Sequence, residues 1–226
     1  MGGFANNAPI VTDGLVFYLD TGNENSYPGN GTTWTDLMDG DSCTLTNGPT
    51  FSSTNGGGIV CDGVDDYITL PTGVVPANTN ITISFIARND YTSLSTNKGI
   101  FSLNGSTRFQ FYLGGASGTS HGRVGAYNGS SYGSSPAPGM QFPIGETHEF
   151  TLVIDGSGNF KLYKDGGLEG SVSGFSFTAN GQTSLGHYPN GSNHGKFTFY
   201  NVRIYDRALT GAEVLQNYNA LKNRFV

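Results

Sequence analysis

Short runs in which apolar and polar side chains alternate recur along most of the chain. An alternation of period two is typical of strands that bury one face and expose the other. The runs lie at residues 15–19, 67–70, 81–85, 109–113, 122–127, 150–154, 160–163, 168–172 and 197–205. In the last run the apolar phase shifts between Phe199 and Val202. This shift indicates either a β-bulge or a strand that is covered on both faces.

Asn-Gly and Asp-Gly dipeptides separate many of these runs. Such pairs tolerate the positive φ angles that tight hairpin turns require. Asp155-Gly156 lies between two alternating runs and predicts a hairpin, and Asp165-Gly166 predicts the turn into the next strand. About a dozen short strands joined by such turns predict an all-β sandwich of two antiparallel sheets.

One helix is predicted at the C-terminal end. Thr210 and Glu213 have the spacing of a capping box, and Leu209 before the cap can pack on Val214. The apolar residues that follow share one helical face. They are Val214, Leu215, Tyr218 and Leu221. We expect this helix to dock on the sandwich after the last strand.

The domain organisation is simple. Residues 1–12 have no pattern and predict an extended N-terminal arm, and residues 13–226 predict one domain. Hydrophobic residues make up 36% of the chain and include 15 Phe, enough to fill a core between two sheets. The 35 glycines are therefore expected mostly in turns.

The charge pattern excludes several classes of partner. The net charge is −6 and the 11 Lys and Arg residues form no basic stripe, so phosphate-mediated binding of nucleic acid is not expected. No apolar run reaches the roughly 18–20 residues that cross a bilayer, so membrane insertion is not expected either. Residues 1–9 lack the basic and apolar parts of a signal peptide. A cytosolic protein, a processed fragment and a virion protein released by cell lysis remain as alternatives.

Cys43 and Cys61 are the only cysteines, and they flank a predicted turn near Ser53. If the flanking segments pair antiparallel, the two side chains could form a disulfide. The alternative is two separate buried thiols, since a disulfide needs an oxidising compartment.

Five segments, in this order and followed by the helix, carry a resemblance to a known family. They are TDGLVFYLD at 12–20, SYPGNGTTWTDL at 26–37, LTNGPTF at 45–51, DGVDDYI at 62–68 and VRIYDRALT at 202–210. Together they resemble the laminin-G-like domain of the concanavalin A-like lectin/glucanase superfamily, in particular the versions in structural and fibre proteins of tailed bacteriophages. The resemblance covers about residues 12–226. Cys43 and Cys61 depart from it, so it implies no disulfide.

The resemblance implies a jelly roll of two antiparallel sheets with a glycan-binding or protein-binding role. We expect a virion surface protein, either a capsid decoration or a fibre or adhesin subunit, that attaches to other virion proteins through residues 1–12. Cell-surface glycans are further expected partners, and a homo-oligomer is left open. The alternative is a free or secreted bacterial lectin, which would be extracellular.

A calcium ion is the one expected cofactor. Asp62, Asp65 and Asp66 cluster around a predicted turn, and calcium takes carboxylate and carbonyl oxygens from loops. Laminin-G-like domains often hold such an ion. The alternative is that these carboxylates only make turn hydrogen bonds. The four histidines lack the spacing of a zinc site.

Catalysis is not expected. Glucanases of the superfamily place two Glu and one Asp on one strand, and Glu24, Glu146, Glu149, Glu169 and Glu213 have no such neighbours. Residues 118–122 match the G-x-S-x-G nucleophile motif. That motif needs a strand before it and a helix after it, whereas a Gly-rich loop and a predicted strand flank this match.

Sugar-binding residues are expected in the Gly-rich loops, because aromatic rings stack on sugar faces while amide and guanidinium groups bind hydroxyls. Tyr91 is a further aromatic candidate. The predicted glycan-binding residues are Arg123, Tyr127, Asn128, Tyr132, His187, Tyr188 and Asn190.

Overall fold

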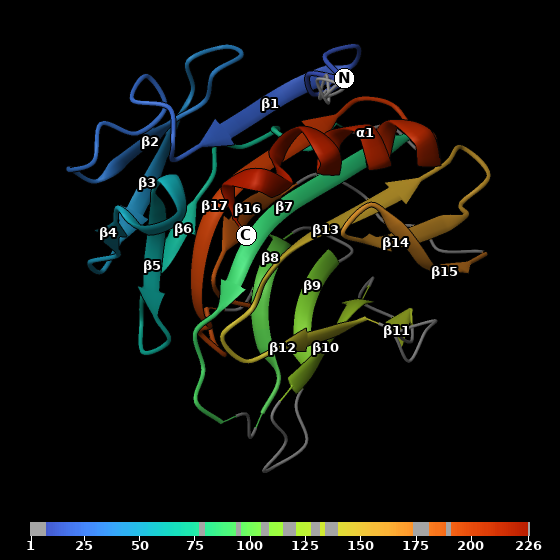
Figure 1. Cartoon of the computed structure of the whole chain (residues 1–226). Coiled ribbons are helices and arrows are strands. Elements are labelled where there is room, and N and C mark those ends of the chain that lie inside the picture. Colours follow the sequence, from blue (N-terminus) through green and yellow to red (C-terminus); the bar gives the residue numbers. More distant parts are fainter. Residues whose placement is uncertain are drawn as a thin grey trace, which may run out of the picture.

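The computed structural model describes residues 8–76, 80–93, 96–104, 109–114, 121–127, 132–133, 140–173, 181–188 and 191–225. Within these residues the chain forms two antiparallel sheets that pack face to face, with one α-helix close to the C-terminus (Figure 1). The all-β sandwich with a C-terminal helix is thus confirmed. No helix in the described part of the chain has the length and apolar character needed to span a membrane.

The first sheet has eight strands in the order β15-β14-β13-β7-β17-β5-β4, and β1 pairs with β17 beside this path. Its strands are β1 (Leu15–Asp20), β4 (Thr50–Ser52), β5 (Gly58–Asp62), β7 (Ile81–Asn89), β13 (Thr147–Ile154), β14 (Phe160–Lys164), β15 (Gly167–Val172) and β17 (Lys196–Tyr205).

The second sheet has nine strands in the order β11-β10-β9-β8-β16-β6-β3-β2, and β12 pairs with β10. Its strands are β2 (Thr33–Thr35), β3 (Ser42–Thr46), β6 (Tyr67–Thr69), β8 (Lys98–Asn104), β9 (Phe109–Gly114), β10 (His121–Tyr127), β11 (Tyr132–Gly133), β12 (Gln141–Pro143) and β16 (Gln182–Leu185). Two short 3-10 turns, Thr54–Gly56 and Lys222–Arg224, complete the described elements with helix α1 (Gly211–Leu221).

The long alternating runs all form strands, and the phase shift in the last run is a bulge. The register of β17 on β7 slips between Phe199 and Asn201, and every residue of β17 after Lys196 is buried, so the strand is also covered on both faces. The predicted hairpin is β13 and β14, in which Ile154 pairs with Phe160. The strands that the pattern missed are mostly short, such as β2, β4 and β12, and too few residues alternate in them to give a signal.

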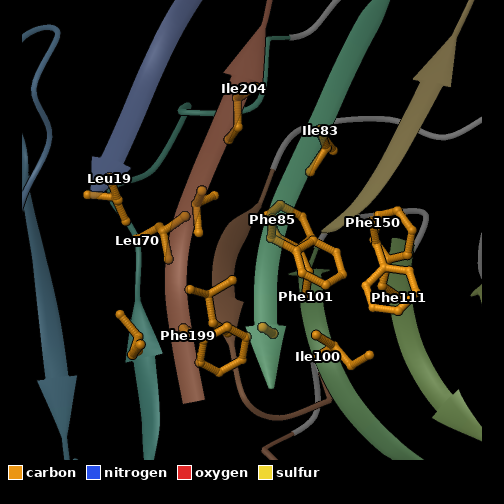
Figure 2. Close-up of a cluster of buried hydrophobic side chains, with 14 of the residues drawn as sticks. Leu19, Leu70, Ile83, Phe85, Ile100, Phe101, Phe111, Phe150, Phe199 and Ile204 are labelled. Carbon is orange, nitrogen blue, oxygen red and sulfur yellow. The ribbon is translucent and has the colours of Figure 1, made fainter. Parts of the chain in front are cut away.

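The core lies between the sheets and is rich in phenylalanine. In the nine-stranded sheet, successive registers align Ile68, Leu185, Phe101 and Phe111 on the inner face. The Phe85 ring of the other sheet meets Phe111 edge to face at 5.2 Å, and the close-up in Figure 2 shows these rings side by side. Interdigitated rings of this kind hold the two sheets together.

Helix α1 covers the outer face of the eight-stranded sheet (Figure 1). The predicted capping box is present, because Thr210 and Glu213 each accept a hydrogen bond from the backbone of the other. Val214 is buried, but Leu215 is 46% exposed, so the predicted apolar face is wrong at that position. Asn217, one turn from Val214, is the second buried residue of the helix.

Asn217 is buried because it holds the N-terminal segment. Its Oδ1 accepts a hydrogen bond from the Val11 backbone N–H at 2.8 Å, and the Tyr205 hydroxyl donates to the Val11 carbonyl at 3.0 Å. Gln216 also donates to the Pro9 carbonyl at 2.8 Å. The end of the predicted arm therefore rests on α1, while residues 1–7 lie outside the described residues.

The two cysteines lie in different sheets, Cys43 on β3 and Cys61 on β5. The proposed antiparallel pairing of their segments is wrong, since β3 pairs with β2 and β6 while β5 pairs with β4 and β17. Both are free and buried, and burial raises the pKa of each thiol. They act as small core side chains.

Candidate functional site

The two sheets differ in what covers their outer faces. Helix α1 and residues 9–11 rest on the eight-stranded sheet, whereas the nine-stranded sheet carries a row of polar side chains. The register places Thr69, Ser184, Ser102 and Gln110 in line across β6, β16, β8 and β9, with Thr44 of β3 at the end. Partners in an antiparallel register share a face, so this polar row backs onto the apolar row of the core.

A groove with a volume of about 410 Å³ opens on this polar face, at β6 and β16. The volume lies in the range of small-molecule sites. Hydroxyl, amide and imidazole groups dominate its lining, which consists of Asn47, Tyr67, Thr69, Gln182, Ser184, His187, Gly191 and His194.

Three rings form one side of the groove. The rings of Tyr67 and His187 meet edge to face at 4.4 Å, and His194 lies 5.5 Å from His187 and 6.0 Å from Tyr67. Tyr67 remains half-buried, so part of its ring faces the groove. Such a ring, bordered by hydroxyls and amides, is suited to a ligand with one apolar face and several polar groups.

The loop that carries both histidines is tied to the sheet by backbone contacts. Ser102 Oγ donates to the His187 carbonyl at 2.6 Å, and the Gly99 N–H of β8 donates to the Asn193 carbonyl at 3.0 Å. A Cβ at Gly99 would overlap the His187 carbonyl group, so glycine allows the loop to approach β8. The groove wall is therefore held in place by the sheet.

The histidines differ in their electrostatic setting. Burial lowers the pKa of His187, and nearby His194 lowers it as well, against the opposite effect of the Tyr188 carbonyl bonded to Nδ1. His187 is therefore neutral at pH 7. His194 has its Nδ1 at 3.4 Å from the Asp66 carbonyl oxygen and its Nε2 at 3.2 Å from that of Gly191.

The predicted acidic cluster adjoins the groove. One carboxylate oxygen each of Asp62, Asp65 and Asp66 lie within 4.8 Å of one another, and Asp66 is 5% exposed. Burial raises the pKa of Asp66, and the neighbouring carboxylates raise it further, while a hydrogen bond from the Asp62 N–H lowers it. Asn47 links cluster and groove by donating to the Asp65 carbonyl at 2.9 Å. The three carboxylates fit the hard oxygen donors that calcium prefers.

The carboxylates of the cluster also accept turn hydrogen bonds, which is the role expected of them if they bind no calcium. Asp66 Oδ2 accepts from Asp62 N–H at 3.0 Å, and Asp62 Oδ1 accepts from Val64 N–H at 2.8 Å. Both interpretations are compatible with this geometry, because each carboxylate retains a second oxygen.

Of the predicted glycan-binding residues, His187 lines the groove and half-buried Tyr188 follows it. Arg123 and Tyr127 lie on β10 and Tyr132 on β11. Strands β9 and β8 separate β10 from β16, so these backbones are roughly 14 Å or more away at about 4.8 Å per strand. Asn128 and Asn190 lie outside the described residues. Among described residues, the predicted set does not converge on one site.

Tyr91 anchors the histidine loop. Its hydroxyl donates to the His194 carbonyl at 3.2 Å and accepts from the Lys196 N–H at 3.0 Å, and its ring packs on Phe197 at 5.9 Å. It is thus a positioning residue for the groove.

Four groove residues that were not predicted as binding residues come from strands β6 and β16. The sequence did show Tyr67 and Thr69 of β6 on the polar face of an alternating run. Gln182 and Ser184 lie on β16, a strand of four residues that no pattern marked. Nothing in the sequence placed that strand between β6 and β8.

A smaller cavity of about 160 Å³ lies between β13 and the C-terminal helix, with His148, Glu149, Asp165 and Tyr218 in its wall. Three of its titratable side chains have close polar partners. His148 Nδ1 lies 2.7 Å from Asp165, and Glu149 lies 2.9 Å from the buried Arg203 guanidinium. In the G-x-S-x-G match, His121 begins strand β10, where the nucleophile motif needs a helix.

Comparison with known proteins identifies related folds. Residues 62–215 match a family model described as the Concanavalin A-like lectin/glucanases superfamily. A search of curated protein sequences finds no match.

Among solved structures, domain 4 of an extracellular GH43 arabinanase from Geobacillus stearothermophilus, in complex with arabinotriose, is 19% identical with a TM-score of 0.71, over 90% of this chain and 98% of that one. A Trypanosoma rangeli sialidase mutant with trans-sialidase activity is 17% identical with a TM-score of 0.69, over 97% of this chain and 35% of that one. The receptor-binding domain of botulinum neurotoxin type G is 16% identical with a TM-score of 0.63, over 91% and 51%. The chain thus spans nearly all of the arabinanase domain but about a third of the sialidase. At these identities the likeness shows the fold.

Proposed function

The chain belongs to the concanavalin A-like lectin/glucanase superfamily, and we propose that it is a non-catalytic domain that binds carbohydrate in the groove on its nine-stranded sheet. The groove is the observation that carries this proposal. It combines the partly exposed ring of Tyr67 with amides from Asn47 and Gln182 and the hydroxyl of Thr69. Sugars present an apolar face and a rim of hydroxyls, which is the complement of such a surface.

Tyr67→Ala is expected to weaken glycan binding by at least about tenfold, because it removes the ring on which a sugar would stack, and tenfold corresponds to about 1.4 kcal/mol. A glycan array would first identify ligands of the wild type, and calorimetry would then measure both proteins. Tyr218→Ala on helix α1 is the matched control, since it makes the same change on the opposite side of the sandwich. Equal affinity of the Tyr67 variant and the wild type would place the site elsewhere.

The absence of catalysis is supported by how the carboxylates are used. Glu149 is ion-paired with Arg203, and Glu213 caps α1 and pairs with Arg207 at 2.7 Å. Neither of these described carboxylates lies in the groove lining. A retaining glycosidase needs two carboxyl groups on the reacting sugar.

We also propose that Asp62, Asp65 and Asp66 hold a calcium ion beside the groove. Bound calcium would neutralise carboxylates that now repel one another. Calcium is therefore expected to raise the melting temperature, since a ligand of the native state stabilises it. Its binding is also expected to give a measurable heat in calorimetry. Asp65→Asn is expected to weaken both effects, whereas Asp39→Asn, outside the cluster, should retain them. No binding heat at millimolar calcium would leave the turn hydrogen bonds as the role of the cluster.

For location, we propose the surface of a tailed-phage virion, as a capsid decoration or a fibre or adhesin subunit. The support is the ordered set of five sequence segments described above. The chain enters the domain beside α1, where Gln216 holds Pro9, while the groove opens on the other sheet. An attachment segment at the N-terminus would thus leave the groove directed away from the particle.

Deleting residues 1–7 is expected to abolish attachment to the particle and to leave the melting temperature unchanged. The deletion spares Pro9 and Val11, whose hydrogen bonds to α1 belong to the folded domain. Co-sedimentation with purified particles would measure attachment, and the full-length chain is the control. Undiminished co-sedimentation of the shortened chain would refute the role of these residues.

A specific observation favours a second candidate, an extracellular bacterial lectin module. The fold covers 98% of the arabinanase domain that was solved with arabinotriose. Mass spectrometry of purified phage particles and of bacterial culture medium separates the two locations.

A further inference from the structure

We infer that, while no cation occupies the Asp62, Asp65 and Asp66 cluster, the groove selects uncharged sugars and discriminates against sugars that carry a carboxylate, such as uronic and sialic acids. The inference rests on the proposed function and adds the chemical class of the ligand. Three features of the described residues support it: the carboxylates beside the groove, the lack of a cation in its lining, and the engagement of its imidazoles.

The acidic cluster of Asp62, Asp65 and Asp66 adjoins the groove, although none of the three is among the residues that line it. Asp66 precedes the groove residue Tyr67, and Gly48, next to groove residue Asn47, would bring a Cβ within 3.9 Å of Asp66 Oδ1. Asp62 and Asp65 are exposed. A carboxylate on a sugar bound in the adjoining groove would experience their negative field, which salt weakens.

No Lys or Arg is among the described residues that line the groove. Two lysines lie close to the histidine loop but do not line the groove. Lys98 Nζ lies 5.9 Å from the centre of the Tyr91 ring, and the backbone of Lys196 pairs with that of Asp62. Sites that bind a carboxylate usually supply a charge-assisted donor, most often arginine.

The two imidazoles direct their ring N–H groups at backbone carbonyls of the described residues and so offer no N–H donor to a ligand carboxylate. His187 is neutral at pH 7, and its Nδ1 bonds the Tyr188 carbonyl. Both ring nitrogens of His194 face backbone carbonyls, those of Asp66 and Gly191. The groups left for a ligand are hydroxyls and amides, which match the hydroxyls of a neutral sugar.

The test compares sugars of equal size that differ in charge. Trisaccharides of glucose, galactose and mannose would each be prepared with a terminal hydroxymethyl, carboxylate or carboxamide group at C6. Calorimetry with the full chain in EDTA, at low ionic strength, is expected to give similar affinities for the hydroxymethyl and carboxamide forms and at least about tenfold weaker binding of the carboxylate. The difference is expected to shrink in 0.5 M salt, because screening weakens repulsion.

Asp65→Asn and Asp62→Asn are expected to narrow the difference as well, since each removes one exposed negative charge. Equal or tighter binding of the carboxylate form, or a difference that is insensitive to both salt and these variants, would overturn the charge selectivity alone. Failure of every trisaccharide to bind would overturn the proposed function together with this inference.

Discussion

Replacing Arg203 by methionine is expected to lower the free energy of unfolding by about 3–5 kcal/mol. Arg203 is 0% exposed, its Nη2 lies 2.9 Å from Glu149 Oε2, and it donates to Ser84 Oγ at 3.1 Å. Methionine fills much of the same volume but leaves the Glu149 carboxylate buried without a counter-charge. Urea denaturation followed by fluorescence would measure the loss.

A double variant separates the charge effect from packing. Arg203→Met combined with Glu149→Met is expected to recover most of the lost stability, because no uncompensated charge remains. Arg88→Met is the surface control. Its ion pair with Asp90 involves a 42% exposed arginine, so the expected loss is about 1 kcal/mol or less. A single Arg203 variant as stable as the Arg88 variant would contradict the importance of the buried pair.

Phe85→Ala is also expected to cost about 3–5 kcal/mol, through lost burial and the cavity that remains. The ring is fully buried and lies 5.2 Å from Phe111 of the opposite sheet and 5.6 Å from Phe150 of its own (Figure 2). It therefore stabilises the contact between the sheets as well as its own strand. The same denaturation experiment measures the effect.

Two further variants calibrate this result. Phe85→Leu keeps most of the volume and is expected to lose less stability than the alanine variant. Leu168→Ala removes a side chain that is 57% exposed and is expected to change stability by about 0.5 kcal/mol or less. If Phe85→Ala were no more destabilising than Leu168→Ala, the two sheets would not depend on this ring.

Much of the secondary structure could be predicted because its causes are local. The alternating runs at residues 81–85 and 150–154 lie in strands β7 and β13, although both runs are buried on both faces rather than exposed on one. The capping box at Thr210 is formed within one turn of chain. The phase shift after Phe199 likewise marked the bulge of β17. Leu215 was misplaced because the helix buries Asn217, whose role depends on a residue 206 positions away.

The candidate site was predicted less completely. The acidic cluster was found because its members are neighbours in sequence, and His187 was found as a polar ring in a loop. The groove itself joins Asn47, Tyr67 and His194, which no local pattern relates. Tyr127 and Tyr132 were predicted to bind glycans because of the composition of the surrounding loops. Loop composition does not show which strands are neighbours in the sheet.

The sequence by itself determined that this protein is an all-β sandwich with a capped C-terminal helix. Alternation, turn dipeptides and the helix cap each depend on residues that are only a few positions apart in the chain. Only the tertiary structure decided that β16 lies between β6 and β8, that its polar row faces outward, and that Cys43 and Cys61 lie in separate sheets. The physical reason is that strand order and register depend on how two whole sheets bury their apolar faces together. Those pairings link distant segments, and the groove exists only where they meet.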